Sequence, residues 1–360
     1  MTDGLGGKPK LVFNPHQTMK YNFLGNTGLL VSELCFGTMT FGGSEGIWEH
    51  VGKVQQDEVN DLIKTAVDAG INFFDTANVY SYGLSEQLLG QSIKTLGLNR
   101  NELVIATKVR GRMSKDVNAI GLSRFHIFNS VDESLKRLQL DHIDVLYVHG
   151  VDLKTPIEET MRALNDIVLT GKVRYIAVCN WPAWMVMKAL GIAEKHGWNK
   201  FVGLQYYYSL SGRDIEREII PLAQGENLGV MPWSPLAGGF LSGKYTRNNE
   251  KAGDSRRDAF DFPPVNKEQA YDIIDAAAKI AESHNVSVAQ VALAWVRHQP
   301  GITSTIIGAK RVEQLNDNIK STEIQLNAEE LAILDGLSSL PKEYPGWMVE
   351  RQSADREPAQ

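Results

Sequence analysis

The sequence predicts a (β/α)8 barrel, an α/β fold in which eight parallel strands alternate with helices around a closed core. Eight short apolar runs rich in β-formers recur along the chain, mostly about thirty to forty residues apart. Most of the intervals between them carry apolar residues at helical spacing. The alternative architecture, a doubly wound sheet, loses its main support because no strand-like run is followed by G-x-G-x-x-G.

The elements follow one another in a regular order. Residues 20–32 predict a β-hairpin, in which two apolar runs flank a Gly-Asn-Thr-Gly turn, at the bottom of the barrel. Residues 33–320 form the expected barrel, and residues 321–360 carry one extra helix over 328–337 and a polar tail over 352–360 expected to be disordered. The expected strands centre on Leu34, Phe73, Val104, Leu146, Ile176, Val202, Val230 and Ile306.

Helices are expected between the strands, with apolar residues repeating over 59–67 and 88–96. Ser85, Ser123 and Ser287 are expected to cap three helices at their N-termini. The last strand-to-strand step is the exception, because residues 235–265 form a long loop rich in Gly, Arg and Asp. A loop of that length is usually functional or mobile.

Composition narrows the class of protein. The 360 residues predict one domain over 1–360, and the net charge of −6 without a basic stretch argues against a nucleic-acid partner. Cys35 and Cys179 both lie in apolar runs, so we expect free thiols in a reducing compartment. No apolar run approaches the ~20 residues of a membrane span, and residues 1–10 lack a signal-peptide core. We therefore expect a cytoplasmic protein with no membrane contact.

Four side chains carry the predicted chemistry. Asp75, Lys108 and His149 each end an apolar run, and Tyr80 follows Asp75 by five positions. Because the active site of a parallel barrel lies at the carboxyl ends of its strands, these four side chains are expected to meet at one rim.

The expected chemistry is proton donation to a carbonyl oxygen. A phenol with a pKa of about 10 is a poor acid near neutrality, and a nearby Lys108 would lower the pKa of Tyr80. Asp75 would hold Lys108, and His149 would orient the carbonyl. Each residue alone is more often structural, and Tyr82 is an alternative acid. A metal-dependent hydrolase is a further alternative, but no H-x-H pair marks a strand end, so no metal is expected.

Five motifs support a resemblance that spans residues 21–318. They are Phe-Asp-Thr-Ala-x-x-Tyr over 74–80, Ala-Thr-Lys over 106–108, Asp-x-x-Tyr-x-His over 144–149, Trp-Ser-Pro-Leu-Ala-Gly-Gly over 233–239 and Ile-Gly-Ala-Lys-Arg-x-x-Gln-Leu over 307–315. With these motifs the chain resembles the aldo-keto reductase superfamily. Segments 121–124 and 241–245 are similar to its branch of potassium-channel β-subunits and their bacterial relatives.

The resemblance implies reduction of aldehydes or ketones by NADPH, with Tyr80 as general acid, Asp75 and Lys108 as its tuners and His149 as the orienting group. It also implies a set of cofactor-binding residues. These are Thr38, Met39, Asp75, Cys179, Asn180, Gln205, Trp233, Ser234, Leu236, Gly238, Lys244, Gly308, Lys310, Arg311, Gln314, Asp317 and Asn318. Cys179 departs from the serine usual in the family, and Arg256 or Arg257 is expected to fold over the cofactor.

The substrate is expected to be a small carbonyl compound. Aromatic residues near the rim, Trp48, Tyr82, Trp181 and Tyr207, are the candidates to contact it. The alternative function is a nicotinamide-binding regulatory subunit of the channel β-subunit type, whose relatives depart from the family at the histidine position. This chain keeps His149, which favours the reductase. A homo-oligomer is compatible with the resemblance, because channel-type relatives form tetramers.

Overall fold

The protein forms a nearly closed barrel of eight parallel strands in a computed structural model that describes residues 19–43, 45–251, 253 and 256–354. Seven strands follow one another in chain order and β10 lies beside β3. The sheet closes where Val230 bridges Ile302, just before β10. The strands are β3 (Leu34–Gly37), β4 (Phe73–Asp75), β5 (Val104–Val109), β6 (Ile143–Val148), β7 (Val173–Cys179), β8 (Phe201–Tyr207), β9 (Gly229–Trp233) and β10 (Thr305–Ile307).

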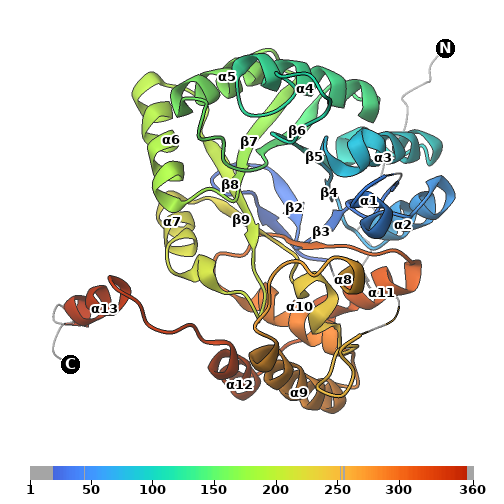
Figure 1. Ribbon diagram of the computed structural model, residues 1–360, viewed down its shortest axis with the longest axis vertical. Helices are drawn as coiled ribbons and strands as arrows, with labels where there is room; N and C mark the ends of the chain where they lie inside the picture. The colour runs from blue at the N-terminus through green and yellow to red at the C-terminus, as the bar shows by residue number, and fades with distance from the viewer. Residues whose placement is uncertain (1–18, 44, 252, 254–255, 355–360) are drawn as a thin grey trace, which may run out of the picture.

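The (β/α)8 prediction is confirmed, and each predicted strand centre lies within a strand. Helices surround the barrel in Figure 1. They are α2 (Gln56–Asp68), α3 (Leu84–Thr95), α4 (Arg124–Leu138), α5 (Ile157–Leu169), α6 (Ala183–His196), α7 (Ile219–Glu226), α10 (Val288–His298) and α11 (Val312–Lys320). Outside them, α9 (Lys267–His284) packs on α12 (Ala328–Ser338), the predicted extra helix. A further helix, α13 (Gly346–Ala354), stands apart from the barrel.

Two of the three predicted helix caps are confirmed. The Ser123 hydroxyl accepts a hydrogen bond from the amide of His126 (3.2 Å), and the Ser287 hydroxyl accepts one from the amide of Gln290 (3.1 Å). The prediction for Ser85 is wrong, because α3 begins after Gly83, whose φ is 95°. The Ser85 hydroxyl is buried and donates to the Thr38 carbonyl instead (2.8 Å).

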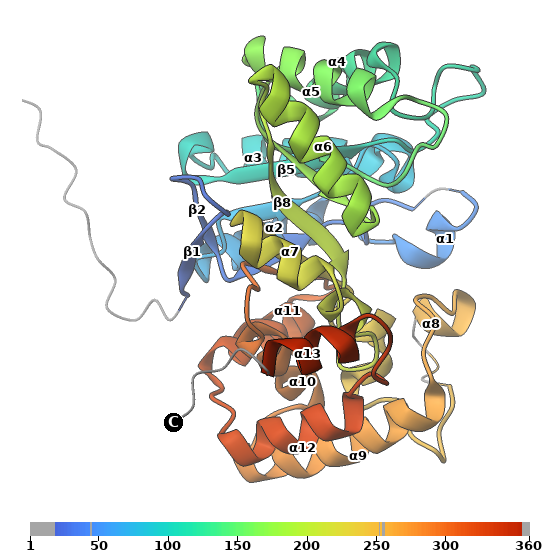
Figure 2. The same cartoon turned by 90° about the vertical axis from the view of Figure 1, so that its left-hand side faces the viewer.

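The two ends of the barrel differ. The predicted hairpin, β1 (Tyr21–Phe23) paired with β2 (Leu30–Ser32), lies at the end where the strands begin. Leu24 and Val31 of this hairpin are fully buried and pack against the barrel interior. Figure 2 shows α1 (Trp48–Val51) and α8 (Arg256–Ala259) on the opposite side, and these two short helices contact one another. The open end of the barrel is therefore framed by α1 and α8.

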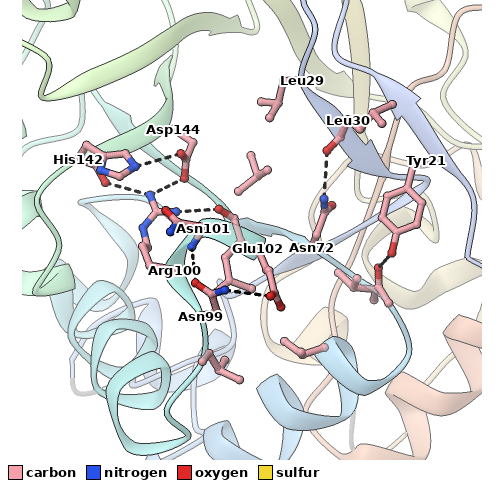
Figure 3. A pocket seen from close by; sticks show the side chains of 16 residues that line it. Tyr21, Leu29, Leu30, Asn72, Asn99, Arg100, Asn101, Glu102, His142 and Asp144 are labelled. Carbon is pink, nitrogen blue, oxygen red and sulfur yellow. Dashed lines mark hydrogen bonds and ion pairs between the residues drawn. The ribbon is translucent and has the colours of Figure 1, made fainter. Parts of the chain in front are cut away.

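A hollow of about 510 Å³ lies at the hairpin end, between the hairpin and the start of β5 (Figure 3). Its polar side chains form hydrogen bonds with one another and with the backbone. Arg100 donates hydrogen bonds to the carboxylate of Asp144 (2.5 Å) and to the carbonyl of Leu103 (2.7 Å), and the Tyr21 hydroxyl donates to the carbonyl of Gly70 (2.7 Å). This end of a parallel barrel generally serves stability, and these contacts fit that role.

Side chains alternate between the inside of the barrel and the helix layer. On β5, Val104 and Ala106 pack inside, while Ile105 and Val109 pack against the helices. The same alternation places Lys108 inside, beyond Ala106. On β6 it places Tyr147 inside. None of the described helices is both long and apolar enough to cross a membrane.

Candidate active site

Asp75 and Lys108 form a buried ion pair at the ends of β4 and β5. The ammonium of Lys108 donates to Oδ1 of Asp75 (2.5 Å) and to the carbonyl of Thr76 (2.8 Å). The amide of Gln205 donates to the other oxygen of Asp75 (2.8 Å). Asp75 and Lys108 are 3% and 1% exposed, so water screens the pair little.

Tyr80 completes the predicted group. It opens the short 3₁₀ helix η1 (Tyr80–Gly83), and its hydroxyl accepts a third hydrogen bond from the Lys108 ammonium (3.2 Å). The ring of His149 stands edge-on to the ring of Tyr80, with centroids 5.9 Å apart. The backbone turns sharply after Tyr80, because Ser81 and Tyr82 take positive φ values of 48° and 52°. The structure thus brings all four side chains to one rim.

Burial and charge set the protonation states. Burial raises the pKa of Tyr80, and the positive charge of Lys108 lowers it. Burial prevails, so the pKa of Tyr80 lies above its usual value, contrary to the net lowering expected from Lys108 alone. Burial alone would lower the pKa of Lys108, but Asp75 and Tyr80 together raise it, which keeps the amine charged. Burial, aided by Lys108 and Arg110, lowers the pKa of His149 to about 3, so its imidazole is neutral.

Aromatic rings border this rim. Trp48 of α1 lies 5.7 Å from Tyr80 between ring centroids, which brings one predicted substrate residue to the site. Tyr207 contacts Trp233 (5.2 Å between centroids), and Phe262 from the long loop stacks on Trp233 (5.8 Å).

The other two predicted substrate residues are Tyr82, which is exposed, and Trp181, which is buried. The Tyr82 side chain is 50% exposed. The Trp181 indole is buried, packs edge-on to Phe201 and donates to the carbonyl of Gly150 (3.0 Å). Trp181 therefore supports the rim from behind, next to His149.

Residues predicted to hold the nicotinamide bind one another or the tetrad. The indole N–H of Trp233 donates to Oδ1 of Asn180 (3.1 Å), and Asn180 takes a positive φ of 59°. The Thr38 hydroxyl donates to the carbonyl of Asp75 (3.2 Å), while Met39 is half-buried. Cys179 is buried at the end of β7, and burial raises the pKa of its thiol. Burial also raises the pKa of the Cys35 thiol, and both thiols are free.

The segment after β9 forms a compact turn. The Ser234 hydroxyl accepts a hydrogen bond from the amide of Gly238 (2.8 Å), and the turn continues into η4 (Ala237–Ser242). Gly238 has a φ of 67°, which glycine adopts without strain. Leu236 is half-buried and Lys244 is exposed.

The residues after β10 lie around the start of α11. The Gln314 side chain accepts a hydrogen bond from the backbone N–H of Lys310 (3.0 Å). The side-chain amide of Asn318 donates to the backbone carbonyl of Gly308, which is an exposed residue (3.2 Å). Arg311 is the N-cap residue, and its side chain makes no capping hydrogen bond. The start of this helix therefore has backbone N–H groups without a side-chain cap, a setting that suits an anion.

Two predicted cofactor residues have structural partners. The carboxylate of Asp317 accepts hydrogen bonds from Ser287 (2.8 Å) and Gln290 (2.6 Å), at the start of α10. Arg257 is buried and donates to the carbonyls of Ala237 (2.7 Å) and Pro263 (2.8 Å). Arg257 thus fastens the long loop together. The side chain of Arg256 lies outside the described part of the structure.

Comparison with known proteins shows the family of the chain. The profile of the aldo/keto reductase family matches residues 33–339. The chain belongs to this family. A Schizosaccharomyces pombe protein provisionally named an aryl-alcohol dehydrogenase is 38% identical over 88% of this chain and 94% of its own length.

Two further relatives show the breadth of the family. The versiconal hemiacetal acetate reductase of Aspergillus parasiticus is 35% identical over 88% of this chain and 96% of its own length. An Arabidopsis thaliana protein provisionally named a voltage-gated potassium channel β-subunit is 36% identical over 85% and 92%. The predicted resemblance, including its branch, is confirmed.

Sequence reasoning missed two residues around the site. Phe262 reaches Trp233 from a loop whose path the sequence does not reveal. Glu86 on α3 is fully buried behind the tetrad and accepts hydrogen bonds from Thr107 and Arg137 (2.6 Å each). The sequence does place the Glu86 carboxylate within an apolar helical pattern, which could have predicted a buried, hydrogen-bonded side chain.

Proposed function

We propose that this protein reduces the carbonyl group of aldehydes or ketones with NADPH, with Tyr80 as the proton donor. The observation that carries the proposal is the position of the Lys108 ammonium, which lies 2.5 Å from Asp75 Oδ1 and 3.2 Å from the Tyr80 hydroxyl. A charged ammonium at that distance stabilises the phenolate that Tyr80 becomes when it gives up its proton. It thereby makes the phenol a stronger acid than burial alone would allow.

His149 and Tyr80 together suit a carbonyl oxygen. Because His149 is neutral, it can donate one hydrogen bond to that oxygen without bringing a second charge beside Lys108. When bound, the reduced dinucleotide supplies a hydride for the carbonyl carbon. Tyr80 then transfers its hydroxyl proton to the oxygen, on which negative charge develops, and an alcohol results. The carbonyl carbon thus gains a hydride from the dinucleotide, and the carbonyl oxygen gains a proton from Tyr80.

The residues present fit a nicotinamide dinucleotide phosphate. The indole of Trp233, which Tyr207 and Phe262 contact, lies beside the amide of Asn180 and would pack against the nicotinamide ring. The N-terminus of α11 lacks a side-chain cap and has Lys310 and Arg311 beside it. Two cations at a helix N-terminus favour a 2′-phosphate, which distinguishes NADPH from NADH. The exposed Lys244 and the Ser234–Gly238 turn would serve the pyrophosphate.

The names of two relatives support a carbonyl substrate, namely an aryl-alcohol dehydrogenase and a hemiacetal acetate reductase. The relative named as a channel β-subunit favours the second candidate, a nicotinamide-binding regulatory subunit. His149 supports the reductase, since it provides a carbonyl-orienting donor that regulation does not need. A cytoplasmic location fits the two free, buried cysteines.

A panel of aldehydes, ketones and alcohols tests the proposal, with NADPH and NADH run in parallel and nicotinamide absorbance as the readout. We expect carbonyl-dependent oxidation of NADPH that exceeds oxidation of NADH. Calorimetric titration of the same protein with each nucleotide measures cofactor affinity separately. Tight NADPH binding without turnover of any carbonyl would reject the reductase and favour the regulatory subunit. Absence of both binding and turnover would reject both candidates.

A further inference from the structure

Arg110 lies at the same rim, one step beyond the tetrad. Arg110 directly follows β5, which ends at Val109, and it is exposed two residues beyond Lys108. The register pairs Lys108 with Tyr147 and Val109 with Val148. The amide of His149 then donates to the carbonyl of Val109 (3.0 Å), which continues the ladder and places Arg110 beside His149.

The side chain and the backbone of Arg110 each make a hydrogen bond. Its Nε donates to the carbonyl of Val151 (3.1 Å), two residues beyond His149. Its own carbonyl accepts a hydrogen bond from the amide of Gly121 (3.0 Å). The φ of Arg110 is 152°, a strained value for a residue with a side chain. Such strain is common where a fold holds a residue for binding or catalysis.

The charge of Arg110 is not neutralised by the described residues. Asp75 is occupied by Lys108 and Gln205. Asp152, in the neighbouring loop, accepts hydrogen bonds from the amide of Leu122 (2.8 Å) and the hydroxyl of Thr155 (2.7 Å). No carboxylate among the described residues lies within ion-pair distance of Arg110. Its exposed guanidinium therefore adds a positive charge beside His149.

The predicted cofactor phosphates are too far around the barrel to use this charge. Their candidate residues follow β9 and β10, which close the barrel, whereas Arg110 follows β5. In the strand order, β5 lies three strands from β10 and four from β9. An anion at Arg110 would thus lie away from the predicted phosphate residues and beside His149, whose amide donates to the carbonyl of Val109.

We propose that Arg110 binds an anionic group of the substrate, so that the preferred substrates are aldehydes or ketones that also carry a carboxylate. This inference rests on the proposed reductase function. A guanidinium presents paired N–H donors that match the two oxygens of a carboxylate. An uncharged ester of the same substrate would lose this interaction while keeping the same reacting carbonyl.

The test compares formylbenzoates with their methyl esters, in the meta and para isomers, for the wild type and two variants. We expect Arg110→Gln to lower kcat/KM for the preferred formylbenzoate by about tenfold to a hundredfold, the usual loss for a hydrogen bond between charged groups. The ester should change less than about threefold. Arg112→Gln is the matched control, since Arg112 donates hydrogen bonds to the backbone carbonyls of Ser114 and Asp116 in its own loop.

Binding of benzoate to the Tyr80→Phe variant, measured by calorimetry in the presence of NADP, gives a readout that needs no turnover. The same titration with Arg110→Gln added should show at least a tenfold weaker affinity. Equal loss for acid and ester, or an equal effect of Arg112→Gln, would overturn the inference. A wild type that reduces no carbonyl but binds benzoate through Arg110 would reject the reductase and leave the anion site standing. Benzoate affinity that is unchanged in Arg110→Gln would reject the anion site.

Discussion

Glu86 accepts a hydrogen bond from the hydroxyl of Thr107 at 2.6 Å, which joins α3 to β5 one residue before Lys108. Its other oxygen accepts a hydrogen bond from Arg137 of α4, also at 2.6 Å. The Glu86 side chain is fully buried and that of Arg137 is 16% exposed. This carboxylate therefore ties the helix that follows Tyr80 to the strand that carries Lys108.

Replacement of Glu86 by alanine should lower the free energy of unfolding by about 3–5 kcal/mol, because it leaves Arg137 largely buried without its partner. Urea denaturation measures this change. Glu133→Ala is the control, since Glu133 makes an exposed pair with Lys136 on the same helix as Arg137 and should leave the denaturation midpoint unchanged. Equal midpoints for Glu86→Ala and wild type would contradict the buried pair.

Replacement of Tyr80 by phenylalanine should lower kcat by about 10²–10⁴, the range for loss of a general acid. NADPH affinity, measured by calorimetry, should stay within about twofold, because only the hydroxyl is removed. Tyr82→Phe serves as the control and should keep its kcat, since Tyr82 is half exposed and lacks the contact to Lys108. A large loss in Tyr82→Phe with none in Tyr80→Phe would reverse the assignment of the acid.

The lowered pKa of the half-buried His149 should make the free energy of unfolding depend on pH. The folded pKa of about 3 lies below the ordinary value of 6.5. Between these values the unfolded chain binds more protons than the folded protein, so His149 favours unfolding increasingly as the pH falls below 6.5. Urea denaturation at pH 7.5 and pH 5 should thus show a smaller loss of stability at low pH in His149→Asn than in wild type. An identical loss in both proteins would show that His149 is not buried in its neutral form.

Arg311→Gln should raise the KM for NADPH by about tenfold or more and leave the KM for NADH nearly unchanged, because only NADPH carries the 2′-phosphate. Initial rates with each nucleotide check the result. Lys320→Gln removes an exposed cation from the other end of α11 and should affect neither KM. A parallel rise in both constants would place Arg311 at a part of the cofactor that the two nucleotides share.

The barrel and the tetrad were predictable from sequence because both depend on local pattern. Apolar runs such as the one over 103–106 predict strands, and a functional side chain, here Lys108, follows each such run within a few residues. The rim that gathers Asp75, Lys108 and His149 then follows from parallel strands alone.

What sequence could not provide depends on contacts between distant segments. The sequence predicted Ser85 to be a helix cap. In the structure the Ser85 hydroxyl donates a hydrogen bond to the backbone carbonyl of Thr38, which is 47 residues away in the chain. The pKa of Tyr80 could not be inferred from its charged neighbours, because the depth of burial decides its direction. Phe262 reaches Trp233 through a loop without a periodic pattern.

The burial of Cys35 and Cys179 within the barrel has a practical consequence. Their sulfurs are shielded from bulk solvent and their thiolates are disfavoured. Alkylating dyes should therefore label the chain only when the β-sheet comes apart. The rate at which the two native thiols are modified would then report how often the barrel unfolds, without an added cysteine.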